Sequence, residues 1–256
     1  MMQKLDTNYL TKKLLPRHIV IYKQISSTNQ YLLEHIKQLS KGTICLAEQQ
    51  TAGRGRRGRQ WHSPLGCQII MSLYWTLPIQ RDIAGLSTVV GLAIADCLQQ
   101  QGAAIQLKWP NDLLFQQRKL GGILIELAKS NDKNLWHLVI GVGINVCLPT
   151  QQQIDQPWAN LNEILEQPDR NSLIVVLIKC IEQYLNDFEQ YGITPHLQQQ
   201  WQDFDAYFDQ EVKVITEQKE IIGMANGIDL QGRLQLITED QQCLLFNGGE
   251  VSLRKK

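Results

Sequence analysis

Apolar residues recur along this 256-residue chain with two different spacings, and the order of these spacings limits the folds open to it. Short alternating runs rich in isoleucine, valine and leucine predict strands, whereas apolar residues three or four positions apart predict helices. One helix is expected to begin with Ser27 or Thr28 as its N-cap and to end at Gly42. Strands are expected at 18–24, 43–48, 67–77, 105–109, 113–116, 121–127 and 135–146, and further helices at 84–101, 161–166, 173–191 and 195–204.

The character of the sequence changes after about residue 209. Turn residues, such as the pairs Asn226-Gly227 and Gln231-Gly232, separate short apolar runs there. These runs predict strands at 212–215, 221–225, 234–237 and 244–246. Closely spaced short strands of this kind are typical of a small β-barrel module. We therefore expect two domains, spanning residues 1–208 and 209–256.

Composition and charge exclude several classes of protein. Hydrophobic residues make up 43% and charged residues 20%, which is ordinary for a water-soluble domain. Lysine plus arginine and aspartate plus glutamate number 25 each, so no net charge draws the chain to nucleic acid or to an anionic membrane. Residues 1–18 lack the apolar run of a signal peptide, and the apolar stretch 89–98 is too short to span a bilayer. We expect a cytoplasmic protein without membrane contact.

The six cysteines are widely separated, and none forms a C-x-x-C pair. Neither a zinc site nor a disulfide framework is indicated. Five of the six stand among apolar residues, where a small buried thiol is the better interpretation. No metal-binding residue is therefore expected.

The segment 49–66 follows neither spacing and carries several glycines and prolines, which predicts a long loop. Within it, Arg54, Arg56, Arg57 and Arg59 place four guanidinium groups in six residues. These forked donors suit carboxylate and phosphate oxygens, and the glycines between them let the backbone approach a ligand closely. Without an anion the four cations repel one another, so we expect a ligand to order the loop.

Three alternatives to the binding of a small anion exist for the stretch 53–61. The letters GRGRRG match a dinucleotide-binding fingerprint, but the WHSPLG that follows will not form the helix that such a site needs. An arginine-rich contact with nucleic acid would need a second basic patch or an aromatic stacking platform, and neither is evident. A solvated loop without a function is the third. Binding of a small anion is favoured over all three.

Two further regions support an anion site. The segment 108–112 (KWPND) ends a predicted strand at a turn that proline fixes, and Lys119 stands beside two glycines at the start of another strand. Lys119 could act as a point charge over a phosphate, although a lysine in this position is more often only solvated. The segment 141–145 (GVGIN) carries glycines inside a predicted strand, which mark a close approach of a ligand or neighbouring backbone, or only a bulge.

Together these motifs resemble the biotin–protein ligase family from about residue 18 to residue 254, which is nearly the whole chain. The resemblance is carried by SSTN at 26–29, AEQQTAGRGRRGRQW at 47–61, KWPNDL at 108–113, KLGGILIE at 119–126, GVGIN at 141–145 and NGGEVSLR at 247–254. One such motif would be weak evidence, whereas all of them in this order are highly specific.

The resemblance implies a function for individual residues. Contacts with biotin would come from Ser27, Thr28, Asn29, Gln50, Arg54, Gly55, Arg56 and Lys119. The nucleotide side would be formed by Arg56, Arg57, Arg59, Trp61, Asn111 and Asn145, with Trp61 stacking near the adenine. The catalytic residues would be Lys119, Arg54, Arg56 and Asp112. Asp112 would assist the attacking lysine of a carrier protein, or would only cap its turn.

The resemblance also implies the fold and the reaction. It implies an α+β catalytic domain of the class II synthetase-like, biotin–lipoate ligase type, with a mixed sheet flanked by helices and a small C-terminal barrel like an SH3 domain. The reaction would join biotin and ATP into biotinyl-5′-AMP, with Mg²⁺ held mainly by phosphate oxygens. The biotinyl group would then pass to a lysine of the biotin carboxyl carrier protein of acetyl-CoA carboxylase.

Several alternatives concern partners and regulation. Some members of the family carry an N-terminal DNA-binding domain and act as repressors, but about 17 residues before the first predicted strand are too few for one, so a short form without a specific DNA partner is expected. Some members dimerise through a sheet edge, which makes a homodimer a further expectation. A lipoate–protein ligase or octanoyltransferase would share the scaffold without needing GRGRRGRQW. A non-catalytic regulator that binds biotin or nucleic acid is the last alternative.

Overall fold

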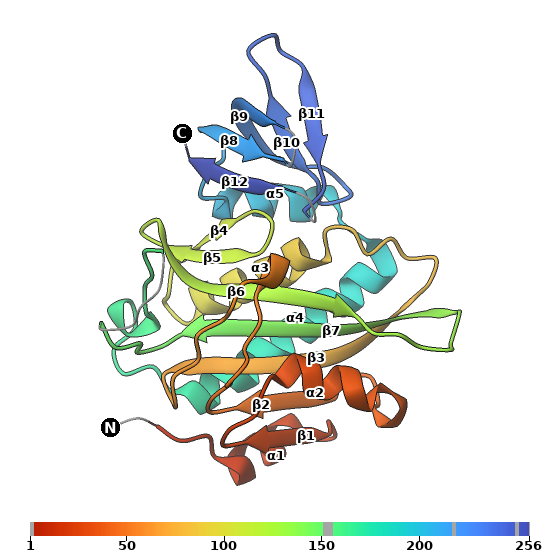
Figure 1. Cartoon of the computed structure of the whole chain (residues 1–256), viewed down its shortest axis with the longest axis vertical. Coiled ribbons are helices and arrows are strands. Elements are labelled where there is room, and N and C mark those ends of the chain that lie inside the picture. Colours follow the sequence, from red (N-terminus) through yellow and green to blue (C-terminus); the bar gives the residue numbers. More distant parts are fainter. Residues whose placement is uncertain (1–2, 151–155, 217–218, 249–250, 256) are drawn as a thin grey trace.

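The polypeptide forms two β-sheets that lie one above the other along the longest axis of the molecule (Figure 1). A computed structural model describes residues 3–150, 156–216, 219–248 and 251–255. Gly249 and Glu250, which belong to the motif at 247–254, lie outside the described residues. In the part of the chain that the structure describes, no helix combines the length and the apolar character needed to cross a membrane.

The larger sheet has seven strands: β1 (Ile19–Tyr22), β2 (Ile44–Ala47), β3 (Gln68–Pro78), β4 (Gln106–Lys108), β5 (Asp112–Phe115), β6 (Arg118–Leu127) and β7 (Leu135–Asn145). Their order is β1-β2-β3-β7-β6-β5-β4. The sheet is mixed, because β1 and β2 are parallel and all other neighbouring pairs are antiparallel. The strands β3 and β7, near the middle of the sheet, pair with each other over their whole length.

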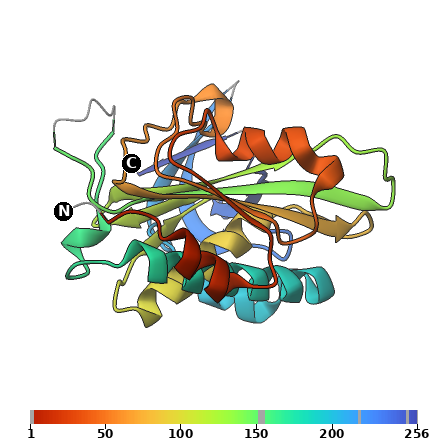
Figure 2. The same cartoon turned by 90° about the horizontal axis from the view of Figure 1, so that it is seen from below.

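Helices cover the two faces of this sheet unequally (Figure 2). On one face lie α1 (Thr7–Leu14), α3 (Leu86–Gln100) and α4 (Arg170–Tyr191), with α5 (Pro195–Phe204) beside α3. The opposite face carries α2 (Thr28–His35), which packs on β2, β3 and β7. Because α2 is only two turns long, it leaves the rest of this face to the loop 49–66.

The smaller sheet contains five antiparallel strands: β8 (Glu211–Ile215), β9 (Glu220–Ile228), β10 (Leu234–Ile237), β11 (Cys243–Phe246) and β12 (Ser252–Lys255). Their order is β11-β10-β9-β8-β12. In β8, β10 and the second half of β9, buried side chains alternate with more exposed ones, as period-2 strands with one covered face require. The predicted fold, a mixed sheet flanked by helices with a separate C-terminal β-sheet, is confirmed. The boundary between residues 208 and 209 stays a prediction.

Buried side chains join the two sheets. Trp109, between β4 and β5, is 1% exposed and donates its indole N–H to the carbonyl oxygen of Gly232 at 3.0 Å. Gly232 packs so closely against Gly85 that a side chain on either residue would overlap the backbone of the other. The β4–β5 turn is therefore fixed against the C-terminal sheet, which matters because this turn carries predicted site residues.

Three local predictions were wrong. The helix that begins after Ser27 ends at His35 and is followed by a 3₁₀ turn, so Gly42 does not close it. The segment 161–166 contains only a 3₁₀ turn. The pair Asn226-Gly227 lies inside β9, opposite a shift in the β9–β10 register, where the positive φ of Gly227 (74°) makes a bulge rather than a turn.

The sequence analysis also missed α1. Asp6 caps this helix by accepting a hydrogen bond from the backbone N–H of Tyr9 at 2.9 Å. Leu10 and Leu14, four residues apart, are fully buried on the side that packs against α4. Three hydrophobic residues in eight, Tyr9, Leu10 and Leu14, give too weak a periodic signal, so α1 depends on its contact with α4.

Candidate functional site

A cleft lies on the face of the larger sheet that carries α2. Its walls come from the first turn of α2, the loop 49–66, the β4–β5 turn, the strands β6 and β7, and β12 of the smaller sheet. The predicted site residues that line it are Ser27, Thr28, Asn29, Gln50, Arg54, Gly55, Arg56, Arg57, Arg59, Trp61, Asn111, Asp112 and Lys119. The fold thus brings together motifs that are far apart in the sequence.

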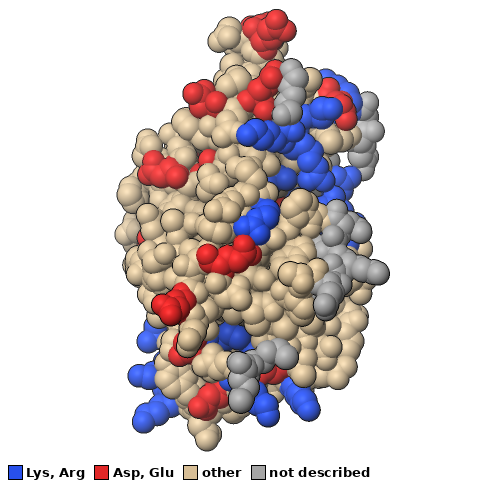
Figure 3. All heavy atoms as spheres, turned by 90° about the vertical axis from the view of Figure 1, so that its left-hand side faces the viewer, with Lys and Arg blue, Asp and Glu red and all other residues tan. Residues whose placement is uncertain are grey.

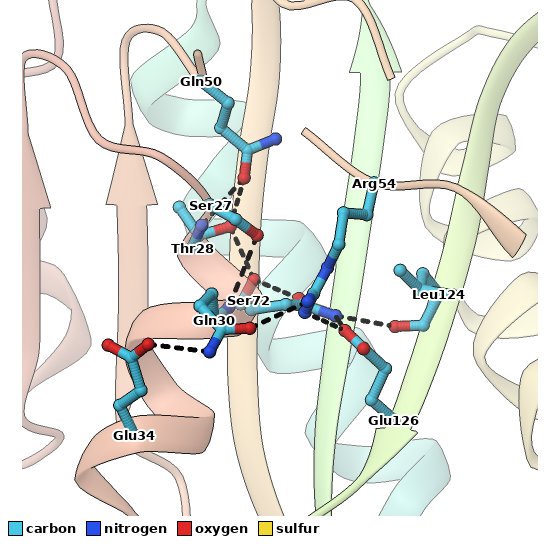
Figure 4. Close-up of polar contacts among 10 residues, drawn as sticks. Ser27, Thr28, Gln30, Glu34, Gln50, Arg54, Ser72, Leu124 and Glu126 are labelled. Atoms are coloured by element: carbon cyan, nitrogen blue, oxygen red, sulfur yellow. Dashed lines mark hydrogen bonds and ion pairs between the residues drawn. The ribbon is translucent and has the colours of Figure 1, made fainter. Parts of the chain in front are cut away.

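One end of the cleft is built on the first turn of α2 (Figure 4). Ser27 caps the helix, because its Oγ accepts a hydrogen bond from the backbone N–H of Gln30 at 3.3 Å. Thr28 donates its backbone N–H and its hydroxyl to Oε1 of Gln50, at 2.8 and 3.1 Å. The loop is thereby joined to the helix.

Asn29 is held from several directions below this turn. Its Nδ2 donates to the carbonyl oxygen of Leu124 at 3.2 Å and to Oε2 of Glu126 at 2.8 Å. Both partners accept hydrogen bonds, so the amide nitrogen must face them and Oδ1 must face the other way, where the hydroxyl of Ser72 lies 2.5 Å from it. A Cβ on Gly141 of β7 would overlap Oδ1, so glycine is needed to make room for this amide.

The hydrogen-bonding groups left over at this end are two donors and one acceptor. Among the described residues, the hydroxyl hydrogen of Ser27 and the Nε2 group of Gln50 have no acceptor. Oδ1 of Asn29 has two lone pairs and uses one for Ser72. A ligand at this end must therefore offer both an acceptor and an N–H or O–H donor.

Lys119 and Asp112 form the charged centre of the cleft. Nζ of Lys119 lies 2.7 Å from Oδ1 of Asp112 and 5.8 Å from the centre of the Trp61 ring. That ring rests on Gly143, where a Cβ would come within 2.7 Å of its carbon atoms. The glycines at 141 and 143 therefore make room for side chains of the site, whereas the sequence had suggested a ligand, neighbouring backbone or a bulge beside them. Nε1 of Trp61 is buried without a hydrogen-bond partner among the described residues.

Two of the loop arginines have protein partners. Arg54 pairs with Glu126 at 2.8 Å. Arg56 donates to Oδ1 of Asn111 at 2.8 Å and to the carbonyl oxygen of Gly248, after β11. The expectation that the loop arginines have only an anion to order them is therefore wrong for Arg54 and Arg56. These arginines tie the loop to the end of the cleft at α2 and to the C-terminal sheet.

The electrostatic character of the cleft is strongly positive. Its basic lining residues are Arg54, Arg56, Arg57, Arg59, Lys108, Lys119 and Arg254, and Asp112 is the one acidic residue among the described residues that line it. Figure 3 shows Lys and Arg side chains gathered at the level where the two sheets meet. Burial lowers the pKa of Lys108 to about 8 and also lowers the pKa of Arg56. Such a cleft favours ligands that carry several negative charges.

The structure separates one predicted residue from the cleft and adds others to it. Asn145 does not line the cleft, because its amide is 3% exposed and bonds to Gln68 and to the carbonyl oxygens of Lys119 and Ala159. Asn145 instead supports the backbone that carries Lys119. Sequence reasoning assigned no role to Lys108, Arg254, Ser72 or Glu126, although all but Ser72 stand inside motifs that it had singled out.

Comparison with known proteins identifies the family. The sequence matches the Biotin/lipoate A/B protein ligase family over residues 21–145 and the Biotin protein ligase C terminal domain over residues 207–254. It is 41% identical to the bifunctional ligase/repressor BirA of Escherichia coli, over 98% of this chain and 79% of that protein. The chain belongs to the biotin protein ligase family. This ligase is also 31% identical to a biotin–[acetyl-CoA-carboxylase] ligase of Mycobacterium tuberculosis, over 93% of this chain and 90% of that protein.

A solved structure agrees with this assignment. The ligase matches the biotin protein ligase from Aquifex aeolicus in complex with biotin and ATP with a TM-score of 0.82 and 30% sequence identity. The match covers 93% of this chain and 99% of that one. The family of the larger domain includes both biotin and lipoate ligases, whereas the match over β8 to β12 is to the biotin ligases by name. The C-terminal sheet therefore argues against the lipoate alternative.

Proposed function

We propose that this ligase joins biotin to ATP as biotinyl-5′-AMP, releases pyrophosphate, and transfers the biotinyl group to a lysine of a carrier protein. One observation carries the proposal. A small set of neutral hydrogen-bonding groups at α2 and a cluster of basic side chains around Lys119 line the same cleft. Biotin has a neutral ureido ring at one end and a carboxylate at the other, and ATP adds further negative charge.

The neutral end of the cleft complements a cyclic urea. A ureido carbonyl oxygen can accept from Ser27 and Gln50, whose donors are otherwise unused among the described residues. A ureido N–H can donate to Oδ1 of Asn29, whose orientation is fixed by its neighbours. A site built on hydrogen bonds of this kind rejects analogues that lack a partner group, because its buried polar atoms are then left unpaired.

The basic end of the cleft suits the first chemical step. The carboxylate of biotin must attack the α-phosphorus of ATP, so two anions have to approach each other and charge builds up on the phosphate oxygens. We assign Lys119, Arg54 and Arg56 to this charge, with Trp61, Arg57, Arg59 and Asn111 on the nucleotide side. The bond between the carboxylate oxygen and phosphorus forms as the bond to pyrophosphate breaks. No nucleophilic side chain is needed for this step.

The donor set of the cleft fits Mg²⁺ that arrives with ATP. No group of three or more histidine, cysteine, aspartate or glutamate residues among the described residues could hold a metal ion by itself. Asp112 and the amide of Asn111 are neighbours in sequence, line the cleft and could add one or two oxygen ligands. Bound there, the ion would neutralise phosphate charge.

Transfer requires that a neutral carrier lysine attack the acyl carbon of the adenylate. The new C–N bond forms, the bond between the acyl carbon and the phosphate oxygen breaks, and AMP leaves. The ammonium group of the carrier lysine must lose a proton before it attacks, and Asp112 is the carboxylate that lines the cleft among the described residues. Its ion pair with Lys119 would place this base beside the phosphate.

The partners follow from the relatives and from the charge balance. We propose the biotin carboxyl carrier protein of acetyl-CoA carboxylase as the acceptor, since the Mycobacterium tuberculosis relative is named for that enzyme. We further propose a cytoplasmic ligase that binds no specific DNA. A homodimer through a sheet edge remains an expectation.

Biotin-dependent exchange between ATP and labelled pyrophosphate tests the first step. The wild-type ligase should catalyse the exchange with biotin and not with lipoate or octanoate. Lys119→Ala should slow it by about 100- to 1000-fold, because one preorganised donor at developing charge is lost. The same variant should transfer preformed biotinyl-5′-AMP to a carrier at a rate much closer to wild type. Exchange at the wild-type rate in Lys119→Ala would show that this residue has been misassigned.

A further inference from the structure

We propose that Glu126 is a positioning residue for ligand recognition, which fixes the orientation of the Asn29 amide and ties it to Arg54 of the loop (Figure 4). The proposal deepens the function proposed above and rests on it. Glu126 stands in β6 and does not line the cleft, so it acts through these two neighbours.

A single carboxylate oxygen joins the two neighbours. Oε2 of Glu126 accepts from Nδ2 of Asn29 and from a terminal nitrogen of Arg54, each at 2.8 Å. The side chain of Glu126 is 26% exposed and that of Arg54 is 38% exposed, so solvent screens their attraction in part. The value of the contact lies in its geometry, because one atom holds a residue of α2 and a residue of the loop at the same time.

The carboxylate of Glu126 and the carbonyl oxygen of Leu124 together decide which end of the amide faces the ligand. If the Asn29 amide were turned over, Oδ1 would face the carbonyl oxygen of Leu124 and the carboxylate of Glu126, so three acceptors would meet without a proton between them. Nδ2 would then face the hydroxyl of Ser72. With Glu126 in place, the amide offers an acceptor to the ligand and therefore selects a ligand with an N–H donor.

The second contact carries this selection to the loop. Arg54 lies on the loop 49–66 and also donates to Oε1 of Gln30 at 2.8 Å. Gln30 in turn donates to Glu34 at 2.7 Å on the outer surface of α2. Glu34 is thus a carboxylate of the same network that touches neither Asn29 nor Arg54 among the described residues. It provides a matched control for the loss of one negative charge at this place.

Glu126→Gln and Glu34→Gln separate positioning from a general loss of charge. In Glu126→Gln we expect the KM for biotin in pyrophosphate exchange to rise about 10- to 100-fold. The reason is that Asn29, which contacts the ligand, no longer donates its hydrogen bond to a charged group. The KM for ATP should stay within about twofold, whereas kcat should also fall, because Glu126 holds Arg54, which we assign to the developing charge. All constants of Glu34→Gln should stay within about twofold of wild type. Melting temperatures of both variants should lie close to wild type.

Discrimination between biotin and an analogue is a further test, because a variant that is merely less stable would discriminate as the wild type does. An analogue of biotin with one ureido N–H replaced by oxygen should be discriminated against by wild type and much less by Glu126→Gln. Glu126→Asp, which keeps the charge and shortens the side chain, should fall between the two and serves as the test if the glutamine variant does not fold. An unchanged KM for biotin, or equal rises in both KM values, would overturn the assignment of Glu126. Absence of biotin-dependent exchange in the wild type would instead refute the proposed function.

Discussion

At the scale of single residues, burial decides the charge of Lys108. The backbone of Lys108 in β4 lies opposite that of Asp112 in β5, and Nζ of Lys108 lies 5.7 Å from the centre of the Tyr207 ring. The pKa of Lys108 is lowered to about 8, mainly by burial; Asp112 opposes this shift, and nearby basic residues such as Arg254 add to it. The free ligase therefore carries a lysine that can lose its proton near neutral pH.

Binding of ATP above pH 8 should take up a proton at Lys108. Below about pH 7 this lysine is charged with or without ligand, so no uptake is expected from it. At pH 8.5 it is largely neutral in the free ligase, and phosphate charge beside it raises its pKa, so the complex gains up to one proton and affinity for ATP falls as pH rises. Calorimetry in two buffers of different ionisation enthalpy measures the uptake, and Lys108→Gln should abolish it. Equal uptake in the variant would assign the proton to another group.

The sequence predicted residues of the site where their types are unusual. Four arginines between glycines are an unusual composition for a loop, so Arg54 and Arg56 could be singled out. A lone glutamate or serine on a strand looks like any surface or core residue, and for this reason Glu126 and Ser72 went unassigned. Asn145 shows the opposite error, because it was assigned to the site although its side chain points into the protein. A motif can lie near a site without each of its side chains facing that site.

At the scale of elements, substitution of each of the two glycines of β7 should weaken the binding of a different substrate. Gly141→Ala would push the Asn29 amide away and raise the KM for biotin, whereas Gly143→Ala would displace the Trp61 ring and raise the KM for ATP. We expect at least about a tenfold effect on the affected substrate in each variant, which corresponds to a loss of about 1.4 kcal/mol. Steady-state kinetics with each substrate varied in turn measures both constants.

Gly122→Ala in the neighbouring strand β6 is the control for these variants. A Cβ there would meet Lys119 and Asp112 at ordinary contact distances of 3.5 to 3.7 Å, so both KM values should change little. If Gly141→Ala and Gly143→Ala raised both constants together, the two ends of the cleft would not be separate subsites.

The long elements could be predicted because their apolar pattern repeats several times, as in α4, β3 and β7. The short ones depend on partners that no local pattern shows. The N-terminal segment before α1 illustrates this: Arg170, 2% exposed at the start of α4, bonds to the carbonyl oxygens of Gln3 and Gly66 and to the carboxylate of Glu48. One buried guanidinium thus holds the N-terminal segment and both ends of the loop 49–66, across more than a hundred residues of sequence.

At the scale of the whole molecule, the arginines of the loop 49–66 lie in the ligand cleft together with Lys108, Lys119 and Arg254. DNA phosphates would therefore have to compete with ATP for the same arginines. We expect any binding to DNA to be weak, strongly dependent on salt and reduced by biotin plus ATP. Fluorescence anisotropy on labelled duplexes, with and without both ligands, measures this. Sequence-specific binding that tightens with ligand would show a regulatory function.

Biotin and ATP together should stabilise the whole ligase more than the sum of their separate effects. Arg56 already joins the loop to Asn111 and to Gly248 beside the C-terminal sheet. An adenylate that fills the cleft would therefore contact the loop, the larger sheet and the C-terminal sheet at the same time. A ligand at a hundredfold excess over its Kd contributes about 2.7 kcal/mol, and each kcal/mol raises the Tm of a chain of this size by about 2–4 °C. Because the adenylate is formed only by catalysis, Lys119→Ala should lose the excess over the sum, and its separate shifts with biotin and ATP should be smaller because one basic contact is missing. Thermal unfolding of the wild type and of Lys119→Ala, with biotin, with ATP and with both ligands, measures these shifts. Strictly additive shifts in the wild type would mean that the two ends of the cleft bind their ligands independently.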